Sequence, residues 1–317
     1  PAKSLDFYAN EVSKIVKEVE VESLDYWVER AGSPGGARPK ILYDADGIEW
    51  LVKFPADSDP KDIGKLEYEY SLAAKKAGII MPQTRLFENK YFGSARFDRK
   101  NGKRLHMLTL SGLLNASHRY PSLDYTDIMK AVFWVTESMV EVEKVFRQMV
   151  FNVLCYNQDD HAKNFSLLYE SDKWIYSPAY DLVYSSGVRG NHSTTILNEG
   201  NPNKSQVIEA GVDAGLKVGL CEQIYLEVEE ATRLACKFTN YMYNYNLLWQ
   251  CTPEEQCFIL LPWRHSGDVD NMITSIKIIK YYQKSVQTPI YRRFIQASLR
   301  KITKYNTLEY LKKPVVN

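Results

Sequence analysis

A short polar segment, residues 156–164, collects the side chains of this 317-residue chain that are best suited to chemistry. It reads Tyr-Asn-Gln-Asp-Asp-His-Ala-Lys-Asn and follows a long apolar pattern without continuing it. Asp159 and Asn164 are five positions apart. A phosphoryl-transfer loop uses this spacing to place a hydroxyl-orienting carboxylate and a Mg²⁺-binding amide. A solvated turn rich in Asn and Asp is an equally good interpretation of these residues alone.

A further carboxylate follows the polar segment at a position that suits the same chemistry. Residues 165–169 and 173–176 predict a β-hairpin whose turn is residues 170–172. Asp181 comes shortly after this hairpin, where a phosphoryl-transfer fold places its second metal-binding carboxylate. The two segments together favour phosphoryl transfer with Mg²⁺ over a plain turn.

The polar segment needs a rigid element in front of it, and the sequence predicts a helix there. Residues 142–154 keep an i, i+3, i+4, i+7 apolar pattern, and Cys155 is expected to be a small buried filler on the same helix. Other segments give local signals of the same kind. Helices are predicted at 4–20, 65–77 and 207–250, hairpins at 41–54 and 84–97, a connection at 98–104 and a long loop at 185–206.

The run NQDDHAKNFSLL, followed by SPAYDL, resembles the catalytic core of the HipA-type toxin kinases. These are serine/threonine kinases of bacterial toxin–antitoxin modules. The similar run is long and lacks the ordinary protein-kinase signature, so the resemblance is specific. It extends over about residues 32–250.

The resemblance implies an α+β, kinase-like fold of two lobes with ATP between them. A small sheet-containing N-lobe with a glycine-rich loop is expected at residues 1–100. A larger, mainly helical C-lobe with the catalytic loop and the metal site is expected at 101–250. Residues 251–317 are expected to form a basic helical extension.

The same resemblance implies roles for the polar residues. Asp159 would orient the substrate hydroxyl and accept its proton, while Asn164 and Asp181 would bind Mg²⁺. Lys163 would stabilise charge on the transferring phosphoryl group, and a salt bridge to Asp160 is an equally good alternative. Replacing Asp160 is expected to have a milder effect on transfer than replacing Asp159.

His161 is placed beside the nucleotide as a hydrogen-bonding element of the loop, since Asp159 already positions the hydroxyl. A metallohydrolase using Asp159, Asp160 and His161 is a further hypothesis, but the sequence offers no convincing additional ligand cluster for it.

Lys53 lies inside an apolar strand pattern, where a buried amine needs a partner. In kinases the partners are the nucleotide phosphates and a helix glutamate, whereas a stem that snorkels at a sheet edge is the common alternative. The resemblance favours the nucleotide. Glu67 and Glu69 flank the apolar stripe of the predicted helix on opposite sides, so periodicity does not choose between them. The resemblance points to Glu67.

A glycine-rich run, residues 32–40, precedes the first predicted hairpin. Glycines let backbone N–H groups approach phosphates, although a flexible surface loop is the more ordinary interpretation. HipA-type kinases carry a similar loop over ATP and autophosphorylate a loop serine, which implies that role for Ser33. Pro34 stands where the family usually has an aliphatic residue. The nucleotide-binding positions in this run are Ser33, Gly35, Gly36, Ala37 and Lys40.

The composition is that of an ordinary globular protein, with 45% hydrophobic and 25% charged residues. No apolar run reaches membrane-spanning length, and the first residues do not read as a signal peptide. The five cysteines are odd in number and form no CxxC pair, which favours reduced thiols over a disulfide framework or a zinc site. A cytoplasmic protein with no membrane partner is expected.

The net charge of +1 hides a strong asymmetry. Residues 271–317 carry +9, and the remainder of the chain carries −8. This distribution predicts an acidic partner for the C-terminal segment, such as nucleic acid. A basic helix face that meets the acidic body is the alternative.

The resemblance implies the toxin of a type II toxin–antitoxin module, which inhibits translation by phosphorylating an aminoacyl-tRNA synthetase. Its partners would be a cognate antitoxin and DNA, reached through the antitoxin or the basic segment. About thirty residues precede the glycine-rich run. The compact form of the family is therefore expected, with the usual N-terminal subdomain absent or supplied by a separate small protein. A catalytically weak kinase-fold scaffold that binds an antitoxin and DNA is the alternative.

Overall fold

The structure is a computed structural model, and the part of the chain that it describes ends at residue 249. The described residues are 4–16, 38–57, 59–60, 62–100, 102–116, 123–187 and 190–249. The chain divides into two compact units, Pro1–Gln250 and Cys251–Asn317, and every described residue belongs to the first. The basic segment 271–317 and positions 32–37 of the glycine-rich run lie outside the described residues.

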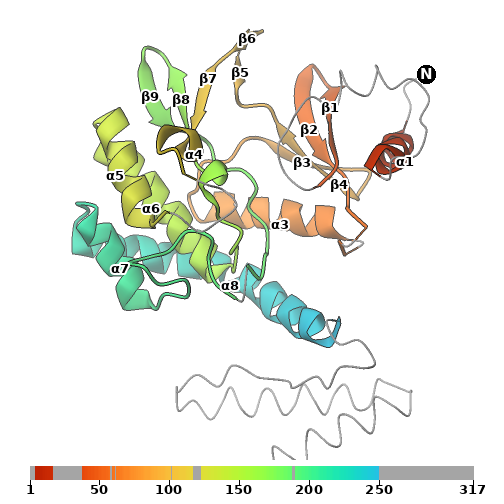
Figure 1. Cartoon of the computed structure of the whole chain (residues 1–317). Helices are drawn as coiled ribbons and strands as arrows, with labels where there is room; N and C mark the ends of the chain where they lie inside the picture. Colours follow the sequence, from red (N-terminus) through yellow and green to blue (C-terminus); the bar gives the residue numbers. More distant parts are fainter. Residues whose placement is uncertain are drawn as a thin grey trace, which may run out of the picture. The chain divides into compact units, whose positions relative to one another are not determined.

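An antiparallel sheet with the strand order β1-β2-β4-β3 forms the first part of this unit (Figure 1). Its strands are β1 (Lys40–Ala45), β2 (Ile48–Lys53), β3 (Thr84–Phe87) and β4 (Tyr91–Ala95). Asp46 and Gly47 both have positive φ angles, 54° and 73°, which is the backbone that a tight Asp-Gly hairpin turn requires. The hairpins predicted at 41–54 and 84–97 are therefore confirmed.

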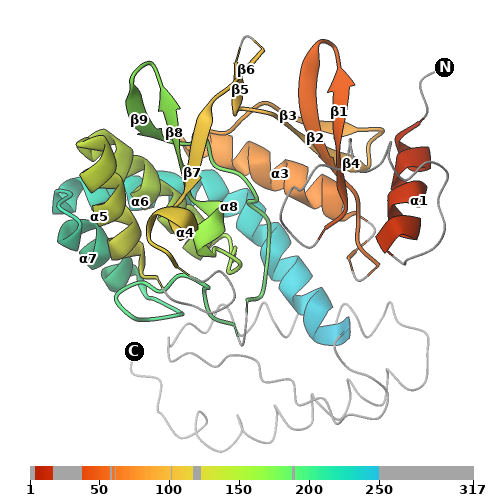
Figure 2. The same ribbon diagram turned by 45° about the horizontal axis from the view of Figure 1, so that its top comes forward.

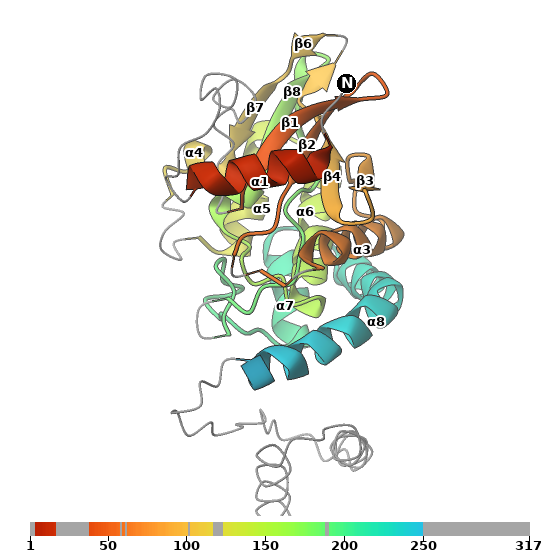
Figure 3. The same ribbon diagram turned by 90° about the vertical axis from the view of Figure 1, so that its right-hand side faces the viewer.

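Helix α1 (Leu5–Val16) lies across the face of β1 and β2 (Figure 3). Its residues Leu5, Tyr8 and Val12 are buried in one apolar cluster with Ile41 and Trp50 of the sheet. The spacing of the three helix residues places them on one side of the helix, which is why this short helix can cover the sheet. Residues 17–20 of the predicted helix lie outside the described residues.

Helix α3 (Ile63–Lys76) lies between the sheet and helix α8 (Figure 1). Leu66, Tyr70 and Ala74 are buried in the larger of two apolar clusters, which continues into the helical part of the unit. The same helix therefore touches both parts. It is well placed to carry a side chain that joins them.

A small third hairpin, β5–β6, connects the sheet to the helical part of the unit. Residues 98–104, predicted as a simple connection, contain the paired strands β5 (Arg99–Lys100) and β6 (Lys103–Arg104). The chain then enters β7 (His106–Thr109), which pairs with β8 (Ser166–Glu170), and β8 pairs with β9 (Lys173–Tyr176). The hairpin predicted after the polar segment is thus β8–β9.

The second part is mainly helical, and α5, α6 and α7 gather on its side away from α1 (Figure 2). Its helices are α4 (Leu110–Leu113), α5 (Tyr125–Thr136), α6 (Met139–Leu154), α7 (Lys204–Asp213) and α8 (Val218–Trp249). Gly211 of α7 approaches Phe146 of α6 so closely that a Cβ would lie 2.5 Å from its ring. The helix predicted at 207–250 is two helices, because the turn at Gly215, with φ of 95°, separates them.

The apolar stripe of α6 forms the centre of the helical core. Val142, Val145, Phe146, Met149 and Val150 are all fully buried, as the pattern predicts. Cys155 is also fully buried, in agreement with its interpretation as a filler. None of the helices in the described ranges is both long enough and apolar enough to span a lipid bilayer.

Candidate active site

The end of α6 places the polar segment. Tyr156 has a positive φ of 53°. The N–H of Asn157 bonds back to the carbonyl of Asn152 (2.9 Å), and that of Tyr156 bonds to Val153 (3.4 Å). This is the Schellman arrangement that terminates a helix sharply. The chain therefore leaves the buried α6 in a fixed direction and enters residues 157–164 as a defined loop.

Asp160 anchors this loop to the interior of the helical part. Its side chain is completely buried, and its carboxylate accepts hydrogen bonds from four groups. They are the Tyr125 hydroxyl (2.7 Å), His192 Nδ1 (2.7 Å), and the backbone N–H groups of Ser193 (2.9 Å) and Thr194 (3.2 Å). The salt bridge from Lys163 to Asp160, considered above as an alternative, is absent from the described ion pairs because these partners occupy the carboxylate.

Asp159, the adjacent carboxylate, has the opposite environment. Its side chain is exposed. Partial desolvation raises its pKa, His161 lowers it, and the nearby Asp181 raises it further. The amide nitrogen of Asn164 donates to the backbone carbonyl of Asp159 (2.9 Å), which ties together the two residues that the sequence singles out. Asp159 therefore lies on a loop whose conformation is fixed by the hydrogen bonds of Asp160 and Asn164.

Asp181 is brought to the same region by the segment that follows β9. The backbone N–H of Ser177 donates to Ser166 (2.9 Å), and that of Ala179 donates to Ile80 (2.8 Å). The hydroxyl of Tyr180 donates to the carbonyl of Lys163 (2.6 Å), which fastens this segment to the polar loop. Asp181 itself has a left-handed φ of 59°. Such backbone in a non-glycine residue costs free energy and is concentrated at functional sites.

Lys53 joins the sheet, α3 and the Asp181 segment. Its amine contacts the carboxylates of both Glu67 and Asp181. Burial alone would lower the pKa of Lys53, but the two carboxylates outweigh that effect and hold the pKa above its ordinary value. Lys53 lowers the pKa of Asp181 to about 2, against the effect of burial. The partnership of Lys53 with Glu67 that the resemblance implied is therefore present, and Asp181 is an additional partner.

Glu67 is the deeply buried member of this network, with only 2% of its side chain exposed, whereas Glu69 is 39% exposed. Burial raises the pKa of Glu67, and Lys53 opposes this only in part. Arg38 also approaches Glu67 at 3.5 Å and makes a two-point contact with Asp59. This role of Arg38 was not evident from the sequence, because no local pattern marks a pairing between residues 29 positions apart.

The remaining predicted residues fall into two groups. Lys40, at the start of β1, is half-buried near Lys53, and burial followed by that neighbouring cation lowers its pKa. His161 is half-buried and Lys163 is exposed in the short helical turn around Ala162–Asn164. The other predicted nucleotide-binding positions, Ser33, Gly35, Gly36 and Ala37, lie outside the described residues.

The donor chemistry of the site fits Mg²⁺. The Asn164 amide nitrogen is engaged with a carbonyl, so the amide oxygen is the atom that can serve a cation. Asp181 supplies a carboxylate. Mg²⁺ commonly takes one or two protein oxygens and completes its shell with phosphates and water. No cluster of three or more His, Cys, Asp or Glu side chains suited to a metal occurs in the part of the chain that the structure describes. The described residues therefore provide no ligand set for the metallohydrolase hypothesis.

Comparisons with known proteins point to one family. The sequence model of the HipA-like C-terminal domain matches residues 32–235. A Sinorhizobium fredii protein named "Putative kinase Y4dM" is 25% identical over 212 residues, or 61% of this chain and 51% of that protein. A Haemophilus influenzae "Putative kinase" is 29% identical over 117 residues, or 33% of this chain and 34% of that protein. The chain therefore spans about half or less of the length of these relatives.

A solved structure supports the fold. A chain in the complex of HipA, HipB and operator DNA, from the toxin–antitoxin system of Shewanella oneidensis MR-1, aligns with a TM-score of 0.56 and 18% identity. The alignment covers 78% of this chain and 66% of that chain. The predicted α+β, kinase-like fold, with a small sheet-containing lobe and a larger helical lobe, is confirmed.

Proposed function

This chain belongs to the family of HipA-like C-terminal domains, and on that premise we propose that it is an ATP- and Mg²⁺-dependent serine/threonine protein kinase. The observation that carries the proposal is the convergence of Lys53, Glu67 and Asp181 beside the loop that holds Asp159 and Asn164. Phosphoryl transfer uses the groups found here, which are a cation, two buried or half-buried carboxylates, an exposed carboxylate and an amide oxygen.

Each residue then has a task that its environment suits. The cationic Lys53, positioned by Glu67, holds the α- and β-phosphates of ATP. Asp181 and Asn164 hold Mg²⁺, which neutralises phosphate charge when bound. Asp159 orients the substrate hydroxyl and accepts its proton as the hydroxyl oxygen bonds to the γ-phosphorus and ADP leaves. Lys163 lies in the same loop, where it would stabilise charge on the transferring group.

Lys53 and Asp181 contact each other, and both are assigned above to the nucleotide or to Mg²⁺. Phosphates and Mg²⁺ would compete for these same groups, since the phosphates attract the amine and the cation attracts the carboxylate. Nucleotide and Mg²⁺ should therefore bind more tightly together than either does alone.

The glycine-rich run extends this proposal to autophosphorylation of Ser33. By resemblance it lies over the ATP phosphates, and a phosphate on Ser33 would add nearly two negative charges there. Those charges would repel the triphosphate and switch the kinase off. Mass spectrometry after incubation with Mg-ATP, beside the Ser33→Ala variant, tests the site. Phosphate found only elsewhere would contradict it.

The biological role proposed is that of a growth-arresting toxin. The solved relative was crystallised with HipB and operator DNA, which supports a cognate antitoxin and, through it or through the basic segment, DNA as partners. The protein substrate proposed is an aminoacyl-tRNA synthetase.

The decisive experiment measures transfer of labelled γ-phosphate by the full chain to proteins of a bacterial lysate. The parent should label a discrete protein, while Asp159→Ala should reduce labelling by about 10³-fold or more, since it removes the hydroxyl-orienting carboxylate. Asp172→Ala is the matched control, because Asp172 is an exposed carboxylate in the β8–β9 turn. Equal labelling by parent and Asp159→Ala would refute the assignment.

A further inference from the structure

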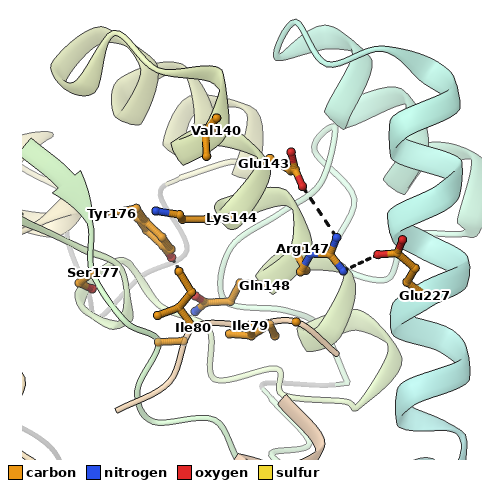
Figure 4. Close-up of a pocket in the computed structure, with 12 residues that line it drawn as sticks. Ile79, Ile80, Val140, Glu143, Lys144, Arg147, Gln148, Tyr176, Ser177 and Glu227 are labelled. Atoms are coloured by element: carbon orange, nitrogen blue, oxygen red, sulfur yellow. Dashed lines mark hydrogen bonds and ion pairs between the residues drawn. The ribbon is translucent and has the colours of Figure 1, made fainter. Parts of the chain in front are cut away.

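The structure also contains a pocket whose lining includes none of the residues assigned above to nucleotide, metal or substrate. Its volume is about 390 Å³, and it lies between the segment that follows α3, residues 140–148 of α6, the end of β9 with the segment that follows it, and α8 (Figure 4). Ile79, Ile80, Val140, Tyr176 and Ala179 provide its apolar lining. This volume lies within the range of small-molecule sites, about 300–1,000 Å³.

An unsatisfied polar group lies in this pocket. The side chain of Gln148 is only 1% exposed. Its amide oxygen accepts from the Tyr176 hydroxyl at 2.9 Å, but its Nε2 group has no hydrogen-bond partner among the described residues. Gln148, Tyr176 and Ile80 all line the pocket, as Figure 4 shows. A buried N–H without a partner is rare in native proteins, so a ligand oxygen that reaches Nε2 would supply the hydrogen bond that the protein does not.

Two side chains of the apolar lining are largely exposed. Ile80 lines the pocket and is 52% exposed, so a rotamer change there displaces little packing. Val140 is 62% exposed and lines the pocket from the start of α6. A small molecule can therefore enter without disturbing the core of the helical lobe.

The charges around the pocket are already paired. Arg147 contacts Glu227 at 2.8 Å and Glu143 at 3.8 Å (Figure 4), and it also donates to the carbonyl of Ala77. Lys144 bonds to Glu141 at 2.7 Å. The pocket thus offers no surplus charge, so an anionic ligand would meet acidic side chains as well as basic ones. A neutral ligand fits this balance better than an ion.

We propose that this pocket binds a small neutral molecule with an apolar body and one amide or carbonyl group. The apolar body packs against the aliphatic and aromatic lining, and the polar group pairs with the Gln148 amide. This site uses none of the residues assigned above to nucleotide, metal or substrate.

The position of the pocket connects it to the phosphoryl-transfer site. Ala179 bonds to Ile80 in the pocket wall and lies two residues before Asp181. The segment containing Ile79 follows α3, the helix that carries Glu67. Occupancy should therefore alter the placement of Asp181 against Lys53 and with it the affinity for nucleotide. This second step rests on the proposed kinase function, whereas binding itself does not.

Binding is tested on the full chain with three probes of matched size: benzamide, benzoate and toluene. Titrations followed by two-dimensional NMR should show saturable binding of benzamide in the millimolar range, with toluene and benzoate at least about fivefold weaker. The Val140→Trp variant should weaken benzamide binding at least about tenfold by filling the pocket. Val218→Trp is the control, because Val218 is also an exposed helix-start valine but does not line the pocket.

A second variant tests the polar contact. Gln148→Glu keeps the shape and the acceptor for Tyr176 but replaces the unpaired donor, so it should remove the preference for benzamide over toluene. Retained benzamide binding in Val140→Trp, or no difference between benzamide and toluene, would overturn the proposed site.

The coupling is measured as the affinity for a non-hydrolysable ATP analogue with and without saturating benzamide. A change of at least about threefold, lost in Val140→Trp, supports it. An unchanged affinity overturns the coupling. A chain that binds benzamide but never binds nucleotide contradicts the kinase function and leaves the pocket standing.

Discussion

Two adjacent carboxylates, Asp159 and Asp160, should separate catalysis from stability. Asp159 is exposed, and its side chain makes no hydrogen bond or ion pair within the described part of the chain, whereas Asp160 is completely buried. We predict that Asp159→Ala abolishes phosphoryl transfer at nearly parental stability. We predict that Asp160→Ala unfolds the protein at a markedly lower temperature.

The magnitude follows from the contacts of Asp160. Four groups donate to its carboxylate. A hydrogen bond to a charged group contributes about 1.5–3 kcal/mol, so an upper bound is about 6–12 kcal/mol. Water entering the space left by the side chain satisfies part of this loss. A net loss of about 3–5 kcal/mol in the free energy of unfolding is expected, as for other broken buried pairs.

The assay is thermal unfolding of the full chain followed by circular dichroism, alongside the phosphate-transfer assay. For a domain of this size, 1 kcal/mol corresponds to about 2–4 °C, so Asp160→Ala should melt about 6–20 °C below the parent. Asp159→Ala should melt within about 2 °C of it. Asp160→Asn should lie between, because its remaining oxygen can still accept from Ser193 and Thr194.

Either of two outcomes would refute this reasoning. Similar melting temperatures for Asp159→Ala and Asp160→Ala would show that the buried hydrogen bonds do not hold the loop. Parental transfer by Asp159→Ala would show that the exposed carboxylate is not the catalytic one. Replacing Asp160 is still predicted to reduce phosphoryl transfer less than replacing Asp159 does, when the rate is compared per folded molecule.

Three further predictions concern the ion network and the C-terminal segment. Lys53 lowers the pKa of Asp181 to about 2, so the ionised carboxylate stabilises the fold at pH values above the ordinary Asp pKa of about 3.9. The difference in melting temperature between the parent and Asp181→Asn should therefore be constant above about pH 5 and should shrink as the pH falls toward 2. A difference that persists at the lowest pH would contradict this. Glu67→Gln should lower phosphate transfer about 10²-fold, because it misplaces Lys53. Glu69→Gln should change transfer less than about twofold, because the Glu69 side chain is half exposed. Equal effects of the two variants would argue against the pairing of Lys53 with Glu67. Deleting residues 285–317 removes seven Lys and Arg residues. The deletion should weaken binding to duplex DNA about tenfold at low salt and make the remaining binding less dependent on salt. Phosphate transfer and melting temperature serve as controls, and salt-independent DNA binding by the parent would contradict the prediction.

Local features of the fold could be predicted from the sequence because they depend on near neighbours. The Asp46–Gly47 turn, the apolar stripe of α6 and the hairpin β8–β9 all follow from turn residues and periodicity over a few positions. The five-residue spacing of Asp159 and Asn164 is of the same kind. The small hairpin at 98–104 was missed because its strands are only two residues long and carry no alternating pattern.

Only the tertiary structure decided which polar groups are buried and with whom they pair. Periodicity left Glu67 and Glu69 equivalent as partners of Lys53, and the packing of α3 against the sheet buried one and left the other half exposed. Asp160 differs from Asp159 because Tyr125 and His192, 35 and 32 positions away, close over it. Burial is a property of contacts between distant segments, so the sequence names the chemical groups, and the fold determines which of them face solvent and which anchor the site.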